Sequence, residues 1–163
     1  MTENNYALAP AEFRVLATPE GPVVETNVRV RFAETDAMGV VYHTNYLIWF
    51  EVGRGAYWRA LGAASTPEMQ DAGSFPVSAA EAHFHAPARY GDLVVIRTRI
   101  IELRSRSITF GYECLLAESG ARLAVGQTTH LFIDENGHAR RLPDPLRRAL
   151  TGATTRPAPV PRG

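Results

Sequence analysis

The chain has 163 residues, 45% of them hydrophobic, which suits one packed domain and argues against a largely disordered chain. Its 17 basic and 17 acidic residues balance to zero net charge, so the composition lacks the basic excess that nucleic-acid binding requires. The sequence contains no lysine, and this excludes a Schiff base and a lysine general base.

The two ends of the chain are predicted to lie outside the packed domain, which is expected to span residues 23–150. Residues 1–22 are predicted to form an extension, with a short turn of helix near Ala11–Leu16. Residues 151–163 are rich in proline and are predicted to be a flexible tail. The N-terminus has no basic start followed by an apolar run, and no stretch of about 18 apolar residues occurs. We therefore expect no signal peptide, no membrane insertion and a cytoplasmic location.

The hydrophobic pattern predicts one strand, one long helix and four further strands. Val28, Val30 and Phe32 alternate with polar residues, as in a half-buried strand, whereas residues 45–61 are apolar on nearly all sides at helical spacing. Tight turns separate the further strands and imply antiparallel pairing. We therefore predict an α+β fold in which one helix covers one face of a five-stranded sheet, whose free edges favour a dimer. The remaining predicted elements are strands at 77–86, 93–103, 107–117 and 122–133, a short helix or turn at 66–72 and a short helix at 142–150.

The predicted long helix has recognisable ends and an unusual interior. Thr44 or Asn45 is expected to cap its start, and Gly62 its end. Gly53 and Gly55 lower its helix propensity by up to ~1 kcal/mol each. Small residues at these positions indicate that another backbone passes close by.

The sequence contains two groups of potential metal ligands, and neither predicts a metal site. His83 and His85 face the same side of a predicted strand, and Glu81 is a conceivable third ligand, but no fourth ligand is evident. Cys114 is the single cysteine, which excludes an internal disulfide and a cysteine-based zinc site. Its place in an alternating apolar run predicts a buried small hydrophobe.

Asp36 and His43 lie in the predicted loop before the long helix. A helix start presents free N–H groups and the positive end of the helix dipole, which together can stabilise an oxyanion. A nearby carboxylate can act as a nucleophile or as a general base for water. These features indicate attack on a carbonyl. The alternative is that Asp36 only forms a turn and that His43 is solvated or bonded to backbone.

The segment RFAETDAMGVVYHTNYLIWFEVGR, from Arg31 to Arg54, resembles the active-site segment of a known family. This family comprises hotdog-fold acyl-CoA thioesterases of the 4-hydroxybenzoyl-CoA thioesterase-like type, and the segment is also similar to thioesterases associated with the Tol–Pal system. The resemblance continues more weakly over residues 24–150. It implies a five-stranded antiparallel sheet wrapped around one long central helix. It also implies a homodimer or homotetramer with the active site at the protomer interface.

The resemblance assigns roles to residues of the loop. Asp36 is implied to be the nucleophile or the general base, and the backbone N–H of His43 to polarise the thioester carbonyl. The His43 imidazole would add a hydrogen bond or a proton, and Tyr42 would line the site. Asn45 is expected to fix the loop rather than to do chemistry. The substrate-binding residues implied by the motif are Gly39, Val40, Val41 and Asn45.

The coenzyme A end of the substrate has candidate partners elsewhere. Arg104 and Arg106 occupy the place of a basic turn that holds coenzyme A phosphates in relatives, and Arg89 is a further candidate; the alternative is that these arginines are only solvated. Glu51 and Arg54 are expected to form an ion pair on the helix, and a buried Glu51 would be a second catalytic carboxylate.

The predicted activity is hydrolysis of an acyl-CoA to a carboxylic acid and free coenzyme A, without a cofactor beyond the coenzyme A of the substrate. A hotdog dehydratase and a non-catalytic module that binds acyl-CoA or an acyl carrier remain as alternatives.

Overall fold

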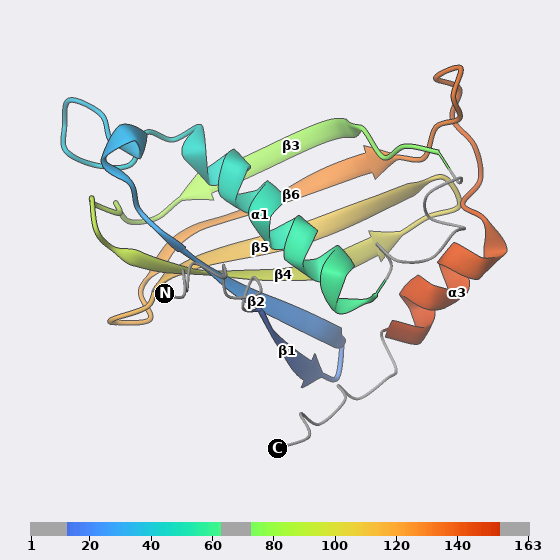
Figure 1. Ribbon diagram of the computed structural model, residues 1–163, viewed down its shortest axis with the longest axis horizontal. Coiled ribbons are helices and arrows are strands. Elements are labelled where there is room, and N and C mark those ends of the chain that lie inside the picture. The colour runs from blue at the N-terminus through green and yellow to red at the C-terminus, as the bar shows by residue number, and fades with distance from the viewer. Residues whose placement is uncertain (1–12, 63–72, 154–163) are drawn as a thin grey trace, which may run out of the picture.

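The computed structural model describes residues 13–62 and 73–153, which form one antiparallel sheet with a helix across one face (Figure 1). The strands follow the order β1-β2-β4-β5-β6-β3. Helix α1 (Asn45–Ala60) lies across the sheet, η1 (Phe32–Glu34) is a short 3-10 turn, and α3 (Asp144–Ala153) follows the last strand. The strands are β1 (Phe13–Thr18), β2 (Gly21–Arg29), β3 (Val77–Phe84), β4 (Leu93–Leu103), β5 (Ser107–Leu116) and β6 (Arg122–Leu131).

The sheet has six strands within the described residues, so the prediction of five was wrong by one. The extra strand is β1, which covers most of the segment predicted as a turn of helix and pairs with β2. Its side chains alternate, with Val15 opposite Val24 and Arg14 opposite Glu25, so the partner strand stabilises the extended conformation. The sheet therefore begins well before residue 23.

The other predicted elements agree with the structure apart from their ends. The later strands and the long helix are observed, but the first predicted strand ends at Arg29, and Phe32 begins η1. Helix α3 continues to Ala153, past the predicted start of the tail. The predicted helix or turn at 66–72 lies outside the described residues.

The core lies between α1 and the sheet. Trp49, Phe50 and Tyr57 project from α1 and are fully buried, and the Phe50 ring stacks on Tyr112 of β5 with centroids 4.5 Å apart. A phenylalanine side chain such as Phe50 contributes roughly 1.5–3 kcal/mol by leaving water. Cys114 is buried in this core, as predicted.

The two ends of α1 differ in how well they were predicted. Gly62 has φ +66° and donates its N–H to Arg59 O at 3.0 Å, so the predicted end is confirmed. Thr44 occupies the N-cap position, but its side chain makes no capping hydrogen bond. The Asn45 side chain donates to carbonyls instead of accepting from the helix, so the predicted side-chain cap was wrong.

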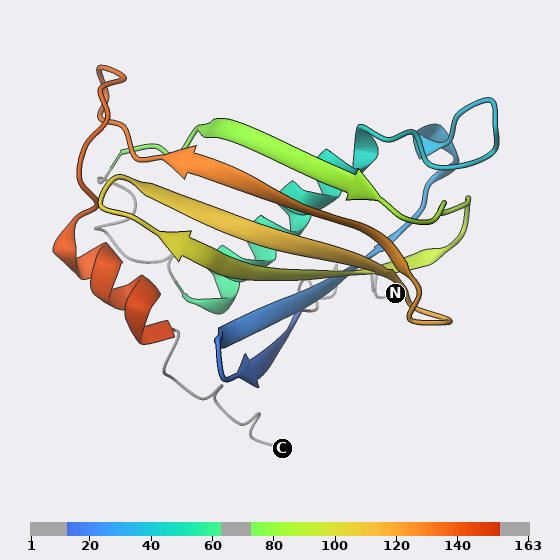
Figure 2. The same ribbon diagram turned by 180° about the vertical axis from the view of Figure 1, so that it is seen from behind.

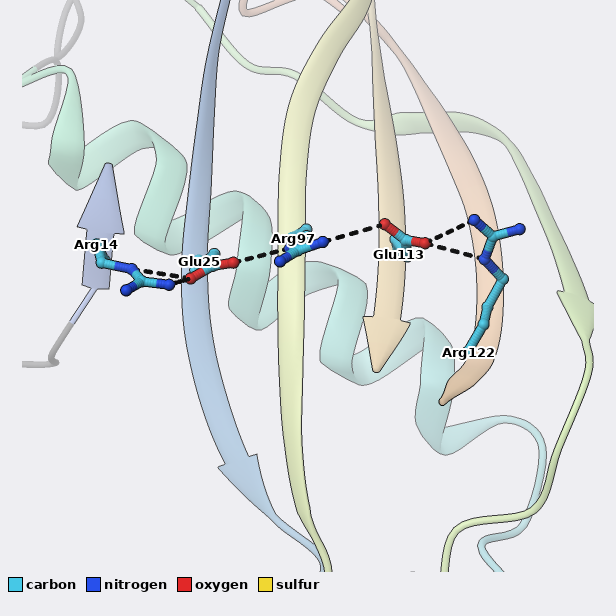
Figure 3. A network of polar contacts seen from close by, with 5 residues as sticks. All are labelled: Arg14, Glu25, Arg97, Glu113 and Arg122. Atoms are coloured by element: carbon cyan, nitrogen blue, oxygen red, sulfur yellow. Dashed lines mark hydrogen bonds and ion pairs between the residues drawn. The ribbon is translucent and has the colours of Figure 1, made fainter. Parts of the chain in front are cut away.

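The outer face of the sheet, opposite α1, carries a row of charged side chains that crosses five strands (Figure 3). Glu25 is buried between two arginines, and Arg97 Nε donates to it at 2.8 Å. Burial alone would raise the pKa of Glu25, but the hydrogen bonds from Arg97 and Arg14 outweigh it and lower the pKa. The row consists of Arg14, Glu25, Arg97, Glu113 and Arg122.

Two further findings concern the described ranges as a whole. None of their helices is both long and apolar enough to cross a membrane. Within the same ranges no three histidine, cysteine or acidic side chains are grouped so as to hold a metal ion. His83 is exposed and pairs with Glu81, which in turn accepts a hydrogen bond from Gln127 at 3.0 Å.

Candidate active site

A loop joins β2 to α1 (Figure 1). Asp36 lies in a tight turn of this loop. Gly39 has φ +73°, which favours glycine, and its N–H donates to Asp36 O at 2.9 Å. Met38 N–H donates to Asp36 Oδ1 at 2.8 Å. In the described part of the chain Asp36 Oδ2 accepts no hydrogen bond, and the side chain is partly accessible. Asp36 therefore shapes the turn and still offers one carboxylate oxygen.

The backbone at the start of α1 leaves donors without acceptors. Asn45 N–H donates to Tyr42 O at 3.0 Å, and Tyr46 N–H donates to His43 O at 3.2 Å, so the chain turns tightly before the helix. Among the described residues, neither the His43 N–H nor the Thr44 N–H donates a hydrogen bond. These two N–H groups add to the positive end of the α1 dipole. The arrangement can accept a developing negative charge.

Aromatic contacts hold the His43 ring beside the edge of the sheet. Its centroid lies 4.5 Å from that of Tyr42 and 6.2 Å from that of Phe84, at the end of β3. His43 is exposed, and Tyr42 is 48% exposed. Tyr42 and His43 therefore line the surface beside the loop.

Glu34 is a buried carboxylate that no pattern in the sequence indicates. Its Oε1 accepts a hydrogen bond from the Trp49 indole at 3.1 Å and another from Arg31 at 3.0 Å, while Oε2 accepts the Arg31 N–H at 2.8 Å. Its backbone carbonyl accepts Tyr42 N–H at 2.8 Å and Asn45 Nδ2 at 3.0 Å. Glu34 thus ties both ends of the loop to α1, and the Asn45 side chain also donates to Tyr42 O at 3.2 Å.

Replacing Glu34 with glutamine is expected to destabilise the protein by about 1–3 kcal/mol at neutral pH, because charge-assisted hydrogen bonds in a buried site are lost. Burial would raise the pKa of Glu34, but the hydrogen bonds from Arg31 and Trp49 lower it below 4.5. The stabilisation is therefore complete above pH 4.5 and is lost as the pH falls through the lowered pKa. Denaturant unfolding of wild type and variant over this pH range measures the effect.

The exposed Glu118 provides the matched control for this prediction. Glu118→Gln should leave the free energy of unfolding within about 0.5 kcal/mol of wild type at every pH, as for most surface substitutions. An equal effect of the two substitutions would contradict the role of Glu34.

The arginine candidates for the coenzyme A end lie at opposite ends of the sheet. Arg89 Nη1 donates to Gly39 O at 3.4 Å, so this residue is beside the Asp36 turn. Arg104 and Arg106 lie in the turn after β4, whereas the Asp36 loop lies near the start of β4. The 11 residues of β4 span roughly 36 Å at about 3.3 Å per residue. One protomer therefore does not bring Arg104 and Arg106 to Asp36.

The other candidates from the sequence lie in the Asp36 loop and on α1. Val41 is buried and donates its N–H to Ala88 O at 2.9 Å, and Val40 O accepts the Asp36 N–H at 2.9 Å. Both valines therefore act through their backbone in fixing the loop. The Glu51 side chain is 73% exposed and lies 3.9 Å from Arg54, so it is the expected ion pair and not a buried carboxylate.

A hollow of about 680 Å³ lies away from this loop, and we do not assign it to the site. Its lining includes Arg97, Arg99 and Gln127, which project from the outer face of the sheet, opposite α1. The sheet therefore lies between these lining side chains and α1. The candidate site is identified by the Asp36 carboxylate and the free N–H groups at the start of α1.

Comparison with known proteins identifies the family of the chain. Residues 30–162 match the thioesterase-like superfamily. The chain belongs to this superfamily. The matched range includes the Asp36 loop, α1 and strands β3 to β6.

Named relatives and solved structures agree with this assignment. YneP of Bacillus subtilis is 32% identical over 113 residues, which are 69% of this chain and 81% of YneP. The acyl-CoA thioester hydrolase YbgC of Escherichia coli O157:H7 is 34% identical over 92 residues, 56% of this chain and 69% of YbgC. The crystal structure of Slr0204, a 1,4-dihydroxy-2-naphthoyl-CoA thioesterase from Synechocystis, is 25% identical with a TM-score of 0.71, covering 79% of this chain and 96% of Slr0204. The resemblance to hotdog thioesterases is thereby confirmed.

Proposed function

We propose that the protein hydrolyses acyl-CoA thioesters to a carboxylic acid and free coenzyme A, with Asp36 driving the attack and the His43 N–H stabilising the oxyanion. One observation carries the assignment of these roles: a carboxylate with an unoccupied oxygen and a backbone N–H without an acceptor lie in the same loop. Membership of the superfamily and the activity named for YbgC support the reaction class.

Two routes are compatible with this arrangement. In the first, an Asp36 oxygen attacks the thioester carbon, the coenzyme A thiolate leaves, and water then hydrolyses the mixed anhydride. In the second, Asp36 takes a proton from water as that water attacks the carbon, and the thiolate leaves with a proton. Both routes place negative charge on the carbonyl oxygen, where the His43 N–H would donate. Neither route assigns a step to a metal or to a further cofactor.

The alternatives receive less support. A dehydratase would need a carboxylate on the long helix, where Glu51 is exposed and paired with Arg54. A non-catalytic binding module would not need an unoccupied carboxylate oxygen and a free backbone donor in the same loop. Thiol release from a panel of acyl-CoAs, followed with a thiol reagent, tests the proposal; if no member releases thiol above the buffer rate, hydrolysis is refuted.

The proposed active unit is a homodimer or a homotetramer. Strand β3 pairs only with β6 among the described strands, so its other edge presents unpaired backbone groups (Figure 2). On α1, Leu47, Ile48 and Val52 are 41%, 50% and 36% exposed. A second copy on this side would cover both features and would complete the site from across the interface. A cytoplasmic location stays a prediction.

Light scattering tests this assembly. The wild type is expected at twice 17.9 kDa or more. Ile48→Glu should lower the mass by placing a charge in the interface, whereas Leu131→Glu, at the end of β6, should not. A wild-type mass of one protomer would contradict the dimer.

A further inference from the structure

The hollow of about 680 Å³ on the outer face of the sheet has the size of a small-molecule site, for which roughly 300–1,000 Å³ is usual. Figure 2 views the sheet from this face. Side chains from all six described strands line the hollow, and none of these lining residues belongs to the Asp36 loop or to α1. The hollow is therefore a second candidate site, separate from the one in the loop.

Arg99 is the one charged side chain in this lining that has no partner among the described residues. It is exposed, and its guanidinium forms neither an ion pair nor a hydrogen bond there. The other acidic and basic lining side chains are engaged; Glu113 lies 2.9 Å from Arg122, and Glu81 accepts a hydrogen bond from Gln127 at 3.0 Å. The engaged side chains are Glu81, His83, Arg97, Glu113 and Arg122. One free cation thus remains in the hollow.

Apolar side chains lie on the same surface as this guanidinium. Ile101 is two residues from Arg99 on the same face of β4 and is 44% exposed. A Cβ at Gly111 would lie 2.8 Å from Ile101 Cγ2, so Ile101 packs over Gly111, which is the residue paired with Arg99 on β5. Leu16 and Val23, paired between β1 and β2, also line the hollow. The hollow therefore offers apolar surface together with one unpaired positive charge.

We infer that the hollow binds an organic monocarboxylate, with the carboxylate on Arg99 and the apolar body against Ile101, Leu16 and Val23. The planar guanidinium fork matches a carboxylate and can donate two hydrogen bonds to it. The apolar body adds to the affinity by leaving water. Both parts of the ligand are needed, because a surface arginine alone holds a small anion only weakly.

The charges around the hollow favour a ligand with one negative charge over a ligand with several. Glu81 and Glu113 also line the hollow, and their carboxylates would repel a polyanion such as a nucleotide. Arg97 and Arg122 lie beside Glu113, so their charges are already balanced. The inference does not rest on the proposed thioester hydrolysis, because the hollow and the Asp36 loop share no residue.

Calorimetric titration with octanoate tests the inference. Acetate and octan-1-ol are the matched probes, since acetate has the charge without the chain and octan-1-ol has the chain without the charge. Octanoate should bind the wild type more tightly than either of them. Arg99→Gln should weaken octanoate binding by at least about tenfold, the scale of lost hydrogen bonds between charged groups, and should leave octan-1-ol binding unchanged.

Arg29→Gln is the matched control for this substitution. Arg29 is exposed, forms no ion pair within the described ranges, and lies at the end of β2 outside the hollow. The control removes the same charge from the protein and should keep the wild-type affinity for octanoate. Both arginines are exposed, so the fold should persist in both variants.

The outcomes separate the inference from the proposed function. Octanoate that binds no more tightly than acetate or octan-1-ol, or that binds Arg99→Gln as tightly as wild type, overturns the inference. A lower mass of Arg99→Gln by light scattering also overturns it, by making the hollow a contact between copies of the chain. Binding of octanoate through Arg99 in a protein that releases no thiol from acyl-CoA supports the inference and refutes the proposed reaction.

Discussion

Replacing Asp36 with asparagine is expected to lower kcat for acyl-CoA hydrolysis by about 10²- to 10⁴-fold, the range attributed to a positioned general base. The loss is expected from either proposed route, because asparagine neither attacks the thioester nor accepts a proton from water. Asparagine keeps an oxygen that can accept the Met38 N–H, so the turn should persist. Initial rates of thiol release measure kcat, and the free energy of unfolding reports any structural effect.

Asp134 is a matched control for this substitution because it forms a similar turn at another place. Its Oδ1 accepts the Asn136 and His138 N–H groups, both at 2.9 Å, in the turn after β6. Asp134→Asn should keep the wild-type kcat. If Asp36→Asn is as fast as wild type, or if the two variants lose equal activity, Asp36 does not drive the attack.

The second large effect is expected from Gly53→Ala, which should lower the free energy of unfolding by about 1–3 kcal/mol. A Cβ at Gly53 would overlap Thr98 Oγ1 and approach Ile96 Cγ2 to 2.8 Å. Both β4 side chains are β-branched and stiff, so they cannot swing aside cheaply. The overlap should outweigh the gain in helix propensity, which is at most ~1 kcal/mol.

Gly55 offers the control for this substitution within the same helix. A Cβ there meets only Arg59 Nη1, at 3.3 Å, the far end of a flexible side chain. Gly55→Ala should therefore raise stability by up to ~1 kcal/mol through helix propensity. Denaturant midpoints of the two variants give the comparison. A Gly53→Ala protein as stable as Gly55→Ala would contradict close packing of α1 on β4.

The sequence predicted those elements whose periodicity is long and uninterrupted. Strand β4 agrees with its predicted bounds, and α1 differs from its prediction by one residue at its end. Strand β1 was missed because its six residues are too few for a clear alternation, and its stability comes from pairing with β2. The sixth strand could therefore not be predicted from residues 13–18 alone, because its stability depends on pairing with β2.

The sequence indicated the functional residues of the Asp36 loop, but it did not indicate the residues that surround this loop. The order of residues around Asp36 and His43 indicated chemistry because a helix start has free donors whatever the fold. Glu34 beside Arg31 has the pattern of a surface ion pair, and only the packing of Trp49 makes it a buried anchor. Arg104 is far from the Asp36 loop because β4 runs away from that loop. The sequence alone does not give the direction of this strand.

The identity of the products distinguishes thioester hydrolysis from hydration and from binding without reaction. Purified wild type is incubated with a saturated acyl-CoA and with the corresponding 2-enoyl-CoA, and the products are identified by mass spectrometry. We expect cleavage of the thioester bond, giving the carboxylic acid and free coenzyme A in equal amounts, with saturable rates. An intact thioester that has gained one water across the double bond, or substrates that remain unchanged, would contradict it.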